Sequence, residues 1–229
     1  MGIAYNTSVV RNGLVLHLDA ANRKSYPGSG TMWRDLSGNS NNSTLINSVV
    51  YDSANNGTMT FDGTNSYVSV PNISITNKLT VSGFVKLSSA RAWQTVIGNW
   101  NSTGSGDSWL LLSSQGSGTA IPSIYVRNST NTGGTNINGT NSLTLNTYHY
   151  LTGIFDEGKL YLYVNGNIVA QNRNVGFTSL YQNSLNLWIG RFSNYYSTSS
   201  IAQAAVYNRA LSQLEIQQNF NALRGRYNI

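Results

Sequence analysis

The strongest constraint on this chain is the spacing of its hydrophobic residues, which alternate with polar residues at a period of two through most of the sequence. Residues 66–70 (Ser-Tyr-Val-Ser-Val) and residues 79–87 show the alternation clearly. Successive side chains of a β-strand point to opposite faces, so this period is typical of strands with one buried face. The sequence therefore predicts a mainly β protein.

Clusters of Gly, Ser and Asn separate these runs and predict turns and loops. The clearest hairpin joins residues 159–164 to residues 167–170 through Asn165-Gly166, a pair that accepts the two positive φ angles of a type I′ turn. Long surface loops are expected over residues 101–107 and 128–141. The expected strands are residues 58–61, 66–70, 79–87, 109–112, 123–126, 149–155, 159–164, 167–170, 185–190 and 201–207.

One segment near the C-terminus departs from the period of two. Ser212 and Glu215 have the spacing of a capping box, which opens a helix. Ile216, Phe220 and Leu223 then recur on one helical face, and Gly225 follows at the expected end. A short C-terminal helix should therefore lie against the β domain.

Regularly spaced short strands with one helix predict an all-β fold, a two-sheet antiparallel jelly-roll sandwich with a short C-terminal helix. The chain has 229 residues, enough for one such domain with a sizeable core. We assign residues 13–226 to this domain and residues 1–12 to an N-terminal extension. No apolar run approaches the length of a membrane span, and no secretory signal is recognisable at the N-terminus.

The composition argues against nucleic-acid binding. The net charge is +6, but only 10% of the residues are charged, and the Arg and Lys residues form no run of five or more, with Arg224 and Arg226 as a mild exception. A groove that follows phosphates needs clustered cations. Asn, Ser and Thr together supply 81 of the 229 residues, so the expected surface is neutral and rich in hydrogen-bonding groups.

Four stretches resemble laminin G-like, concanavalin A-like domains over almost the whole chain. The opening of these domains is matched by residues 14–22 and 33–45, and their second strand pair by Met59-Thr-Phe-Asp-Gly63 with Tyr67 and Val68. The sheet hairpin is matched by residues 160–169, and the closing strand and helix by residues 205–220. The resemblance implies a concanavalin A-like jelly roll whose terminal strands lie near each other.

Two short sequence motifs make the family resemblance more specific. Ser25-Tyr-Pro-Gly28 and the ending Gln218-Asn-Phe-Asn-Ala-Leu-Arg-Gly-Arg-Tyr227 are similar to the version found in virion proteins of tailed bacteriophages. This implies a non-enzymatic virion protein, either a capsid decoration protein or a fibre or adhesion module. Its partners would be other virion proteins and cell-surface glycans, and it would form a homo-oligomer or a symmetric assembly. The alternatives are a lectin module not tied to a virion and, less favoured, a glycoside hydrolase.

Glycoside hydrolases of this fold use two nearby carboxylates. This chain has only two Glu residues, Glu157 and Glu215, and Glu215 is explained by the capping box. Glu157 adjoins Asp156, but neighbouring side chains on an extended backbone point to opposite faces. His17 and His149 read as structural residues. We therefore predict no catalytic residues and no enzymatic activity.

Some laminin G-like domains hold calcium, and Asp19, Asp62 and Asp156 are the candidates for such a site. Calcium takes six to eight oxygen ligands, so these residues would serve only if the fold gathers them. Asp62 and Asp156 each stand close to a glycine and read better as turn formers. We therefore predict no metal site and no cofactor.

Aromatic residues in polar surroundings are the candidates for contact with glycans or protein partners. These are Trp100 and Trp109, on either side of a Gly/Ser-rich segment, and the adjacent Tyr195 and Tyr196 in a polar loop. Adjacent tyrosines on a strand face opposite ways, so at least one should be exposed. For this pair, glycan contact and contact with a subunit or capsid are equally favoured. By contrast, Trp33, Trp93, Trp188 and Phe61 have apolar neighbours and are predicted to lie in the core.

Overall fold

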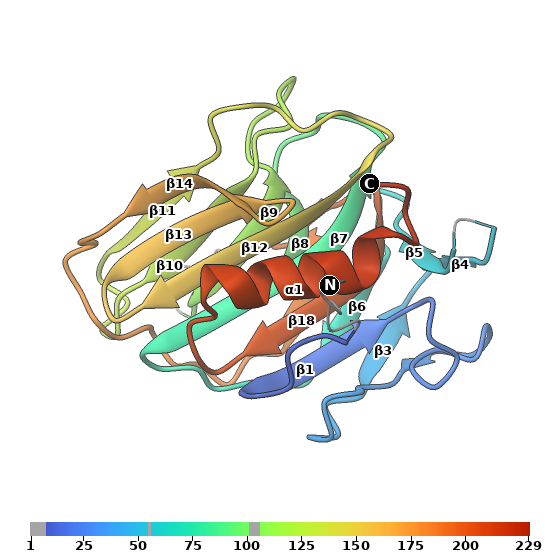
Figure 1. Ribbon diagram of the computed structural model, residues 1–229, viewed down its shortest axis with the longest axis horizontal. Coiled ribbons are helices and arrows are strands. Elements are labelled where there is room, and N and C mark those ends of the chain that lie inside the picture. Colours follow the sequence, from blue (N-terminus) through green and yellow to red (C-terminus); the bar gives the residue numbers. More distant parts are fainter. Residues whose placement is uncertain (1–7, 55, 101–105) are drawn as a thin grey trace, which may run out of the picture.

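Two antiparallel sheets face each other in a computed structural model that describes residues 8–54, 56–100 and 106–229 (Figure 1). One sheet is called the back sheet, although it lies nearer the viewer in Figure 1. In it, β1 (Leu14–Asp19) pairs with β18 (Ser199–Tyr207) beside the main strand path. That path is β14 (Asn167–Asn172), β13 (Lys159–Val164), β12 (Tyr148–Asp156), β7 (Lys78–Leu87), β18 (Ser199–Tyr207), β5 (Thr58–Thr60) and β4 (Val50–Asp52).

The second sheet, the front sheet, also has eight strands. A separate two-stranded hairpin contacts β8 (Gln94–Asn99) and consists of β16 (Arg191–Phe192) and β17 (Tyr195–Tyr196). The order of the front sheet is β11 (Gly134–Asn138), β10 (Ser123–Arg127), β9 (Trp109–Ser114), β8 (Gln94–Asn99), β15 (Leu187–Ile189), β6 (Tyr67–Val70), β3 (Ser43–Ile46) and β2 (Met32–Trp33).

The main core fills the space between the two sheets. Alternate residues of each strand supply it, for example Leu79, Val81 and Val85 from β7 and Ile124 and Val126 from β10. The period of two in the sequence therefore corresponds to inward positions, as expected for a sandwich. The predicted all-β sandwich is confirmed.

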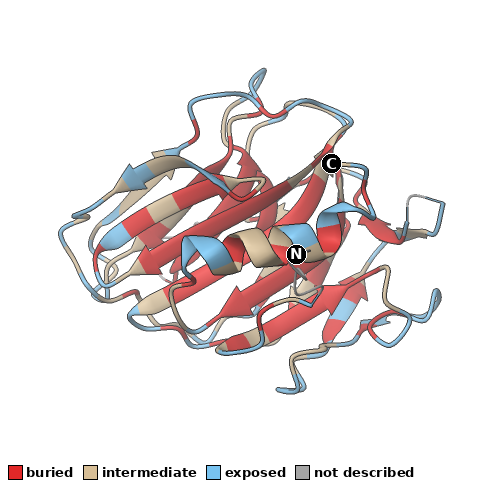
Figure 2. Ribbon diagram, viewed as in Figure 1, coloured by how far each residue is buried: buried red, intermediate tan, exposed pale blue. Residues whose placement is uncertain are grey.

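A second apolar cluster lies outside the sandwich, on the outer face of the back sheet. There the helix α1 (Gln213–Arg224) crosses the sheet (Figure 1). Its Ile216 and Leu223 belong to one cluster with Phe84 and Tyr150 of the sheet. Figure 2 shows buried strands beneath a helix whose outer side is exposed. The helix thus closes one outer face of the sandwich.

The predicted capping box is present at the start of α1. Ser212 accepts from the backbone N–H of Glu215 at 3.3 Å, and the Glu215 carboxylate accepts from the Ser212 N–H at 2.9 Å. The described residues contain no helix that is both long enough and apolar enough to cross a bilayer.

Both ends of the described chain pack on this helix-covered face. Val10 is buried, and Tyr227 lies with its ring centroid 5.1 Å from that of Phe84 and 4.6 Å from that of Tyr148. Val10 and Tyr227 stand just outside the range 13–226 assigned to the domain. Burial raises the pKa of Tyr227 well above its ordinary value.

The predicted Asn-Gly hairpin is confirmed, since Asn165 has φ 51° and Gly166 φ 78° between β13 and β14. The prediction that residues 128–141 form a loop is wrong in part, because β11 pairs with β10 over five residues. Residues 101–105 of the other predicted loop lie outside the described residues, but Asp107 is fully buried rather than on the surface. Strand β8, at the centre of the front sheet, was not predicted.

Candidate functional site

The outer face of the front sheet, the front face, has no helix over it in the described part of the chain. Strand pairing places one outward position from each of six neighbouring strands in a single row across this face. The row is Asn136, Tyr125, Leu110, Gly98, Trp188 and Ser69. The aromatic residues of the row are Tyr125 and Trp188, which are separated by Leu110 and Gly98. Each of them belongs to a cluster of aromatic side chains.

The first cluster, the Trp100 cluster, consists of Trp93, Trp100, Tyr125, Phe192 and Tyr195. The ring centroid of Tyr125 lies 5.9 Å from that of Trp100 and 5.8 Å from that of Trp93. The ring of Phe192 continues the series, 5.0 Å from Trp93 and stacked on Tyr195 at 5.9 Å. These rings cover two buried leucines of β9 and form a continuous aromatic surface.

A hollow of about 260 Å³ opens at one end of the Trp100 cluster. The guanidinium of Arg127 lies 5.3 Å from the Trp100 ring centroid and 3.8 Å from the buried carboxylate of Asp107. The hollow thus combines half-buried aromatic rings with a positioned guanidinium and amide groups. Its lining is Trp100, Tyr125, Arg127, Gly134, Thr135 and Asn136.

The second cluster surrounds Arg191 and is called the Arg191 cage. The guanidinium carbon of Arg191 lies 4.1 Å from the ring centroid of Trp188, 4.7 Å from that of Tyr67 and 5.2 Å from that of Tyr196. Its Nε donates to the carbonyl of Ser193 at 2.8 Å. A cation within about 6 Å of an aromatic face is attracted by the ring, so three rings fix this side chain.

The β16–β17 hairpin joins the two clusters. Its two cross-strand pairs are Arg191 with Tyr196 and Phe192 with Tyr195. Adjacent residues of a strand point to opposite faces, so the first pair belongs to the Arg191 cage and the second to the Trp100 cluster. The hairpin therefore contributes two residues to each of the two clusters.

The structure brings together three of the four predicted contact residues. Trp100 and Tyr195 belong to the Trp100 cluster, and Tyr196 belongs to the Arg191 cage. Tyr195 is 49% exposed, in accord with the expectation that one tyrosine of the pair faces solvent. The prediction for Trp109 is wrong. Its side chain is 1% exposed and belongs to the main core, because position 109 of β9 faces inward together with Leu111.

Two tryptophans predicted to lie in the core are half-buried on the front face instead. Trp188 stands between Leu187 and Ile189, whose side chains face the core, so its own side chain faces outward. Trp93 has φ 58° just before β8, and its ring lies on Phe192. Trp33 and Phe61 are buried in the core as predicted. The front-face aromatics missed from the sequence are Tyr67, Trp93, Tyr125, Trp188 and Phe192.

The three calcium candidates are not brought together. Asp19 is buried and accepts from Arg226 at 2.7 Å, and Asp156 lies 3.2 Å from Lys78. Asp62 accepts from the backbone of Thr64 at 2.8 Å within its turn. Burial would raise the pKa of Asp62, but hydrogen bonds from Thr64 and the next two residues outweigh it and lower the pKa to about 2. Among the described residues there is no group of three or more acids and histidines that could hold a metal ion.

The two glutamates also lie beside cations. Glu215 forms a pair of hydrogen bonds with Arg209 at 2.6 and 2.9 Å. Glu157 lies 3.4 Å from Lys78, which is also the partner of Asp156. The expectation that Asp156 and Glu157 face opposite ways is wrong, because Glu157 has φ 47° and the turn brings both carboxylates to one cation.

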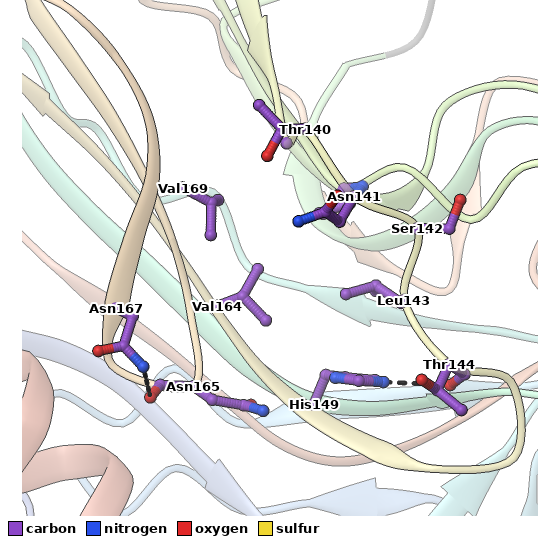
Figure 3. A pocket seen from close by; sticks show the side chains of 12 residues that line it. Thr140, Asn141, Ser142, Leu143, Thr144, His149, Val164, Asn165, Asn167 and Val169 are labelled. Atoms are coloured by element: carbon purple, nitrogen blue, oxygen red, sulfur yellow. Dashed lines mark hydrogen bonds between the residues drawn. The ribbon is translucent and has the colours of Figure 1, made fainter.

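A second hollow, of about 310 Å³, lies where the connection from β11 to β12 passes the ends of β12, β13 and β14 (Figure 3). Val164 and Val169 face Leu143 across it, and His149 lies at one side with its Nε2 3.1 Å from the carbonyl of Thr144. Burial lowers the pKa of His149, as it does that of the buried His17. This hollow has no Phe, Tyr or Trp and no carboxylate in its lining.

The fold is shared with several known binding domains. It superposes on the binding domain of Paraclostridial Mosquitocidal Protein 1 with a TM-score of 0.70, 16% identity and 93% of this chain covered. The botulinum neurotoxin serotype D ligand binding domain in complex with N-acetylneuraminic acid gives a TM-score of 0.67 with 13% identity and 93% coverage. The chain spans about half, 52%, of each of these toxin binding domains. At these identities the likeness shows the fold alone.

A match of comparable length is domain 4 of AbnA, a GH43 extracellular arabinanase from Geobacillus stearothermophilus, in complex with arabinotriose. Its TM-score is 0.69 with 15% identity, and the match covers 90% of this chain and 97% of that domain. No curated protein matches the sequence.

The family is shown by the sequence itself, together with the two-sheet sandwich described above. Residues 62–217 match the Laminin_G_3 family. This segment runs from the turn after β5 into α1 and contains every residue of the two aromatic clusters. The chain therefore belongs to the concanavalin A-like lectin/glucanases superfamily.

Proposed function

We propose that the chain is a non-enzymatic carbohydrate-binding module whose ligand lies on the front face. The observation that carries this proposal is the hollow beside Trp100, where two half-buried rings meet the guanidinium of Arg127 and the amide of Asn136. Sites for small ligands combine apolar or aromatic walls with a few positioned polar groups. A sugar ring offers the matching chemistry, with apolar C–H faces and a rim of hydroxyls.

The two aromatic clusters favour a ligand of several sugar units. The Trp100 cluster and the Arg191 cage flank the same hairpin, so a chain of sugars can contact rings on both sides of it. The amides that border the Trp100 hollow are fixed by their neighbours, as Asn136 donates to Asn138 at 2.9 Å. The known structure of the arabinanase domain with arabinotriose supports an oligosaccharide ligand.

Binding without hydrolysis is supported by the positions of the acids. Each of Asp19, Asp62 and Glu215 is held by its own partners, which are Arg226, the backbone of the turn at Thr64, and Arg209. Asp107 is the acid nearest to the Trp100 hollow, and it is buried and lies 3.8 Å from Arg127. A retaining glycosidase needs a nucleophile and an acid about 5 Å apart across the scissile bond. A hydrolysis assay on plant and bacterial polysaccharides checks this part of the proposal, and released reducing ends would contradict it.

The experiment for the binding site is a glycan array followed by calorimetry on the best ligand. Trp100→Ala should weaken binding about tenfold or more, and Tyr196→Ala should weaken it to a similar degree. Leu214→Ala is the matched control, since Leu214 is 78% exposed on the helix of the opposite face. Circular dichroism verifies that all three variants are folded. Absence of binding to every glycan at millimolar concentration would overturn the proposal.

We further propose that this module acts in the virion of a tailed bacteriophage, as a capsid decoration protein or as part of a fibre. Two sequence motifs support this setting, Ser25–Gly28 near the start of the domain and Gln218–Tyr227 at its end, because they resemble virion proteins of tailed bacteriophages. A neutral surface rich in Asn, Ser and Thr suits packing on a shell. In that setting the protein would assemble in symmetric copies with other virion proteins and contact cell-surface glycans.

Mass spectrometry of purified particles tests the virion setting. The protein should be found in intact virions in a fixed ratio to the capsid protein. Its absence from the particles, together with retained glycan binding, would leave the alternative of a lectin module not tied to a virion.

A further inference from the structure

The charges of the front face suggest which saccharides it takes. All eight acids of the chain belong to the described residues, and none lies within 4.0 Å of Arg191. The other arginine of the face, Arg127, has the carboxylate of Asp107 at 3.8 Å. The front face therefore carries two arginines that lie on tryptophan rings. Arg127 has a nearby acid, and Arg191 does not.

Arg191 is also held in place, which distinguishes it from exposed cations. The ring centroids of Trp188 and Tyr67 lie within 5 Å of its guanidinium carbon, and its Nε–H donates a hydrogen bond to the carbonyl of Ser193. Exposed cations elsewhere on the surface, such as Lys24, lack such a cage. A fixed guanidinium loses little further conformational entropy when it binds a ligand.

The geometry leaves one part of Arg191 for a ligand. Guanidinium has five N–H donors, and in the described residues only the one on Nε has a hydrogen-bond partner. The two terminal nitrogens form a planar fork that matches the two oxygens of a carboxylate. The aromatic rings contact the flat face of the guanidinium group. The terminal N–H groups at its edge are left to pair with a ligand.

We infer that the front face is selective for acidic saccharides, and that Arg191 is the residue that sets this selectivity by binding a sugar carboxylate. This inference rests on the proposed carbohydrate-binding function. Rings of both clusters contact the sugar faces, while the fork of Arg191 takes the carboxylate of a hexuronate or of a sialic-type sugar. Because Asp107 lies beside Arg127, that arginine contributes less to discrimination between acidic and neutral sugars.

Matched ligands test the inference directly. Trigalacturonate and galactotriose with the same linkage differ only at C6, and sialyllactose and lactose differ by one acidic sugar. The unmodified protein should bind the acidic member of at least one pair about tenfold more tightly in calorimetry. The pair that shows the preference identifies the source of the carboxylate. Equal affinity for both members of both pairs would overturn the inference while leaving the carbohydrate-binding function in place.

Matched variants then assign the selectivity to one residue. Arg191→Gln should bring the ratio of the affinities for the acidic and the neutral ligand close to one, whatever change it causes in the affinity for the neutral ligand. Arg191→Lys should retain only part of the preference, because it keeps the charge but loses the fork. Arg224→Gln is the control. It removes an arginine that lies 5.6 Å from the Phe220 ring on the helix of the opposite face, and it should keep the full preference.

The outcomes separate the two proposals. Retention of the acidic preference by Arg191→Gln would overturn the role of Arg191. Lack of binding to any of the four ligands and to the wider glycan array would overturn both. If circular dichroism shows that Arg191→Gln does not fold, the Arg191→Lys variant decides. Full preference for the acidic ligand in that variant, with an affinity that does not change with salt concentration, would contradict pairing through the guanidinium fork.

Discussion

The side-chain amide of Asn219 donates a hydrogen bond of 3.0 Å to the hydroxyl of Tyr207. The amide oxygen accepts from the backbone N–H of Val10 at 2.7 Å, and the Tyr207 hydroxyl donates to the carbonyl of Val10 at 3.0 Å. These three bonds form a closed buried ring that joins α1, β18 and the N-terminal segment. Burial accordingly raises the pKa of Tyr207 well above its ordinary value.

Removal of this amide should destabilise the domain strongly. Asn219→Ala leaves the Val10 N–H unpaired in a buried site, and the Tyr207 hydroxyl loses a donor. We expect a loss of about 2–4 kcal/mol in the free energy of unfolding, measured by urea denaturation followed by fluorescence. Leu214→Ala, on the exposed side of the same helix, should change it by about 0.5 kcal/mol or less. Equal effects of the two variants would show that the ring contributes nothing specific.

Two glycines near α1 should respond oppositely to alanine. Gly166 has φ 78° in the β13–β14 turn, so Gly166→Ala should destabilise by about 1–2 kcal/mol. Gly225, the C-cap residue of α1, has φ −60° and open space around its Cα, so Gly225→Ala should be neutral or stabilising by about 0.5 kcal/mol. Thermal unfolding of both variants measures the difference, and an unaffected Gly166→Ala variant would argue against the type I′ turn.

Acid should weaken the attachment of the helix through Glu215. The hydrogen bond from Arg209 outweighs burial and lowers the pKa of Glu215 to about 2. Because the folded-state pKa is depressed, the stabilisation is complete above the ordinary carboxyl pKa of about 4.3 and is lost as the pH falls towards 2. Unfolding in urea at about pH 6 and about pH 3 should therefore differ less in Glu215→Gln than in the unmodified protein.

Arg209→Gln provides the control for that measurement, since it removes the partner instead of the acid. It should reduce the same pH dependence. An unchanged pH dependence in both variants would mean that other carboxylates, such as Asp62 in its turn, account for it.

Chelation should leave glycan binding intact. The candidate calcium ligands Asp19, Asp62 and Asp156 are engaged by Arg226, by backbone N–H groups and by Lys78 in separate places. Calorimetry in the presence of EDTA and of added calcium should give the same dissociation constant within about twofold. A dissociation constant that rises tenfold or more on chelation would show that a metal takes part after all.

Many of the strands were predicted from short runs in which apolar residues alternate with polar ones or follow one another between turn residues. Two of the strands that were missed, β11 and β8, show where this pattern gives no signal. Strand β11 (Gly-Thr-Asn-Ile-Asn) is an edge strand with both faces partly solvated, so polar residues occupy both, and nothing distinguishes it from a loop. Strand β8 contains register shifts and a glycine, which disrupt the alternation although every residue in it is buried.

The site was predicted only in part, and for a related reason. Trp100, Tyr195 and Tyr196 were found because their neighbours are polar. Trp188 was placed in the core because its neighbours are apolar, yet in a strand the neighbours of an outward residue are the inward ones. The same alternation could have placed Tyr125 and Arg127 on one outer face of β10. The hairpin β16–β17 packs on β8, and its Tyr196 lies near Tyr67 of β6. These contacts are tertiary and leave no local signal in the sequence.

The position of the chain ends has a consequence for avidity. Val10 and Tyr227 both pack on the helix-covered face, whereas the aromatic clusters lie on the opposite outer face of the sandwich. A tether at either end would therefore hold the front face outward, away from whatever carries the domain. Several tethered copies could then engage one polysaccharide at the same time. Such multivalent attachment can strengthen overall binding by about 10²–10⁴ without any new contact within a single copy.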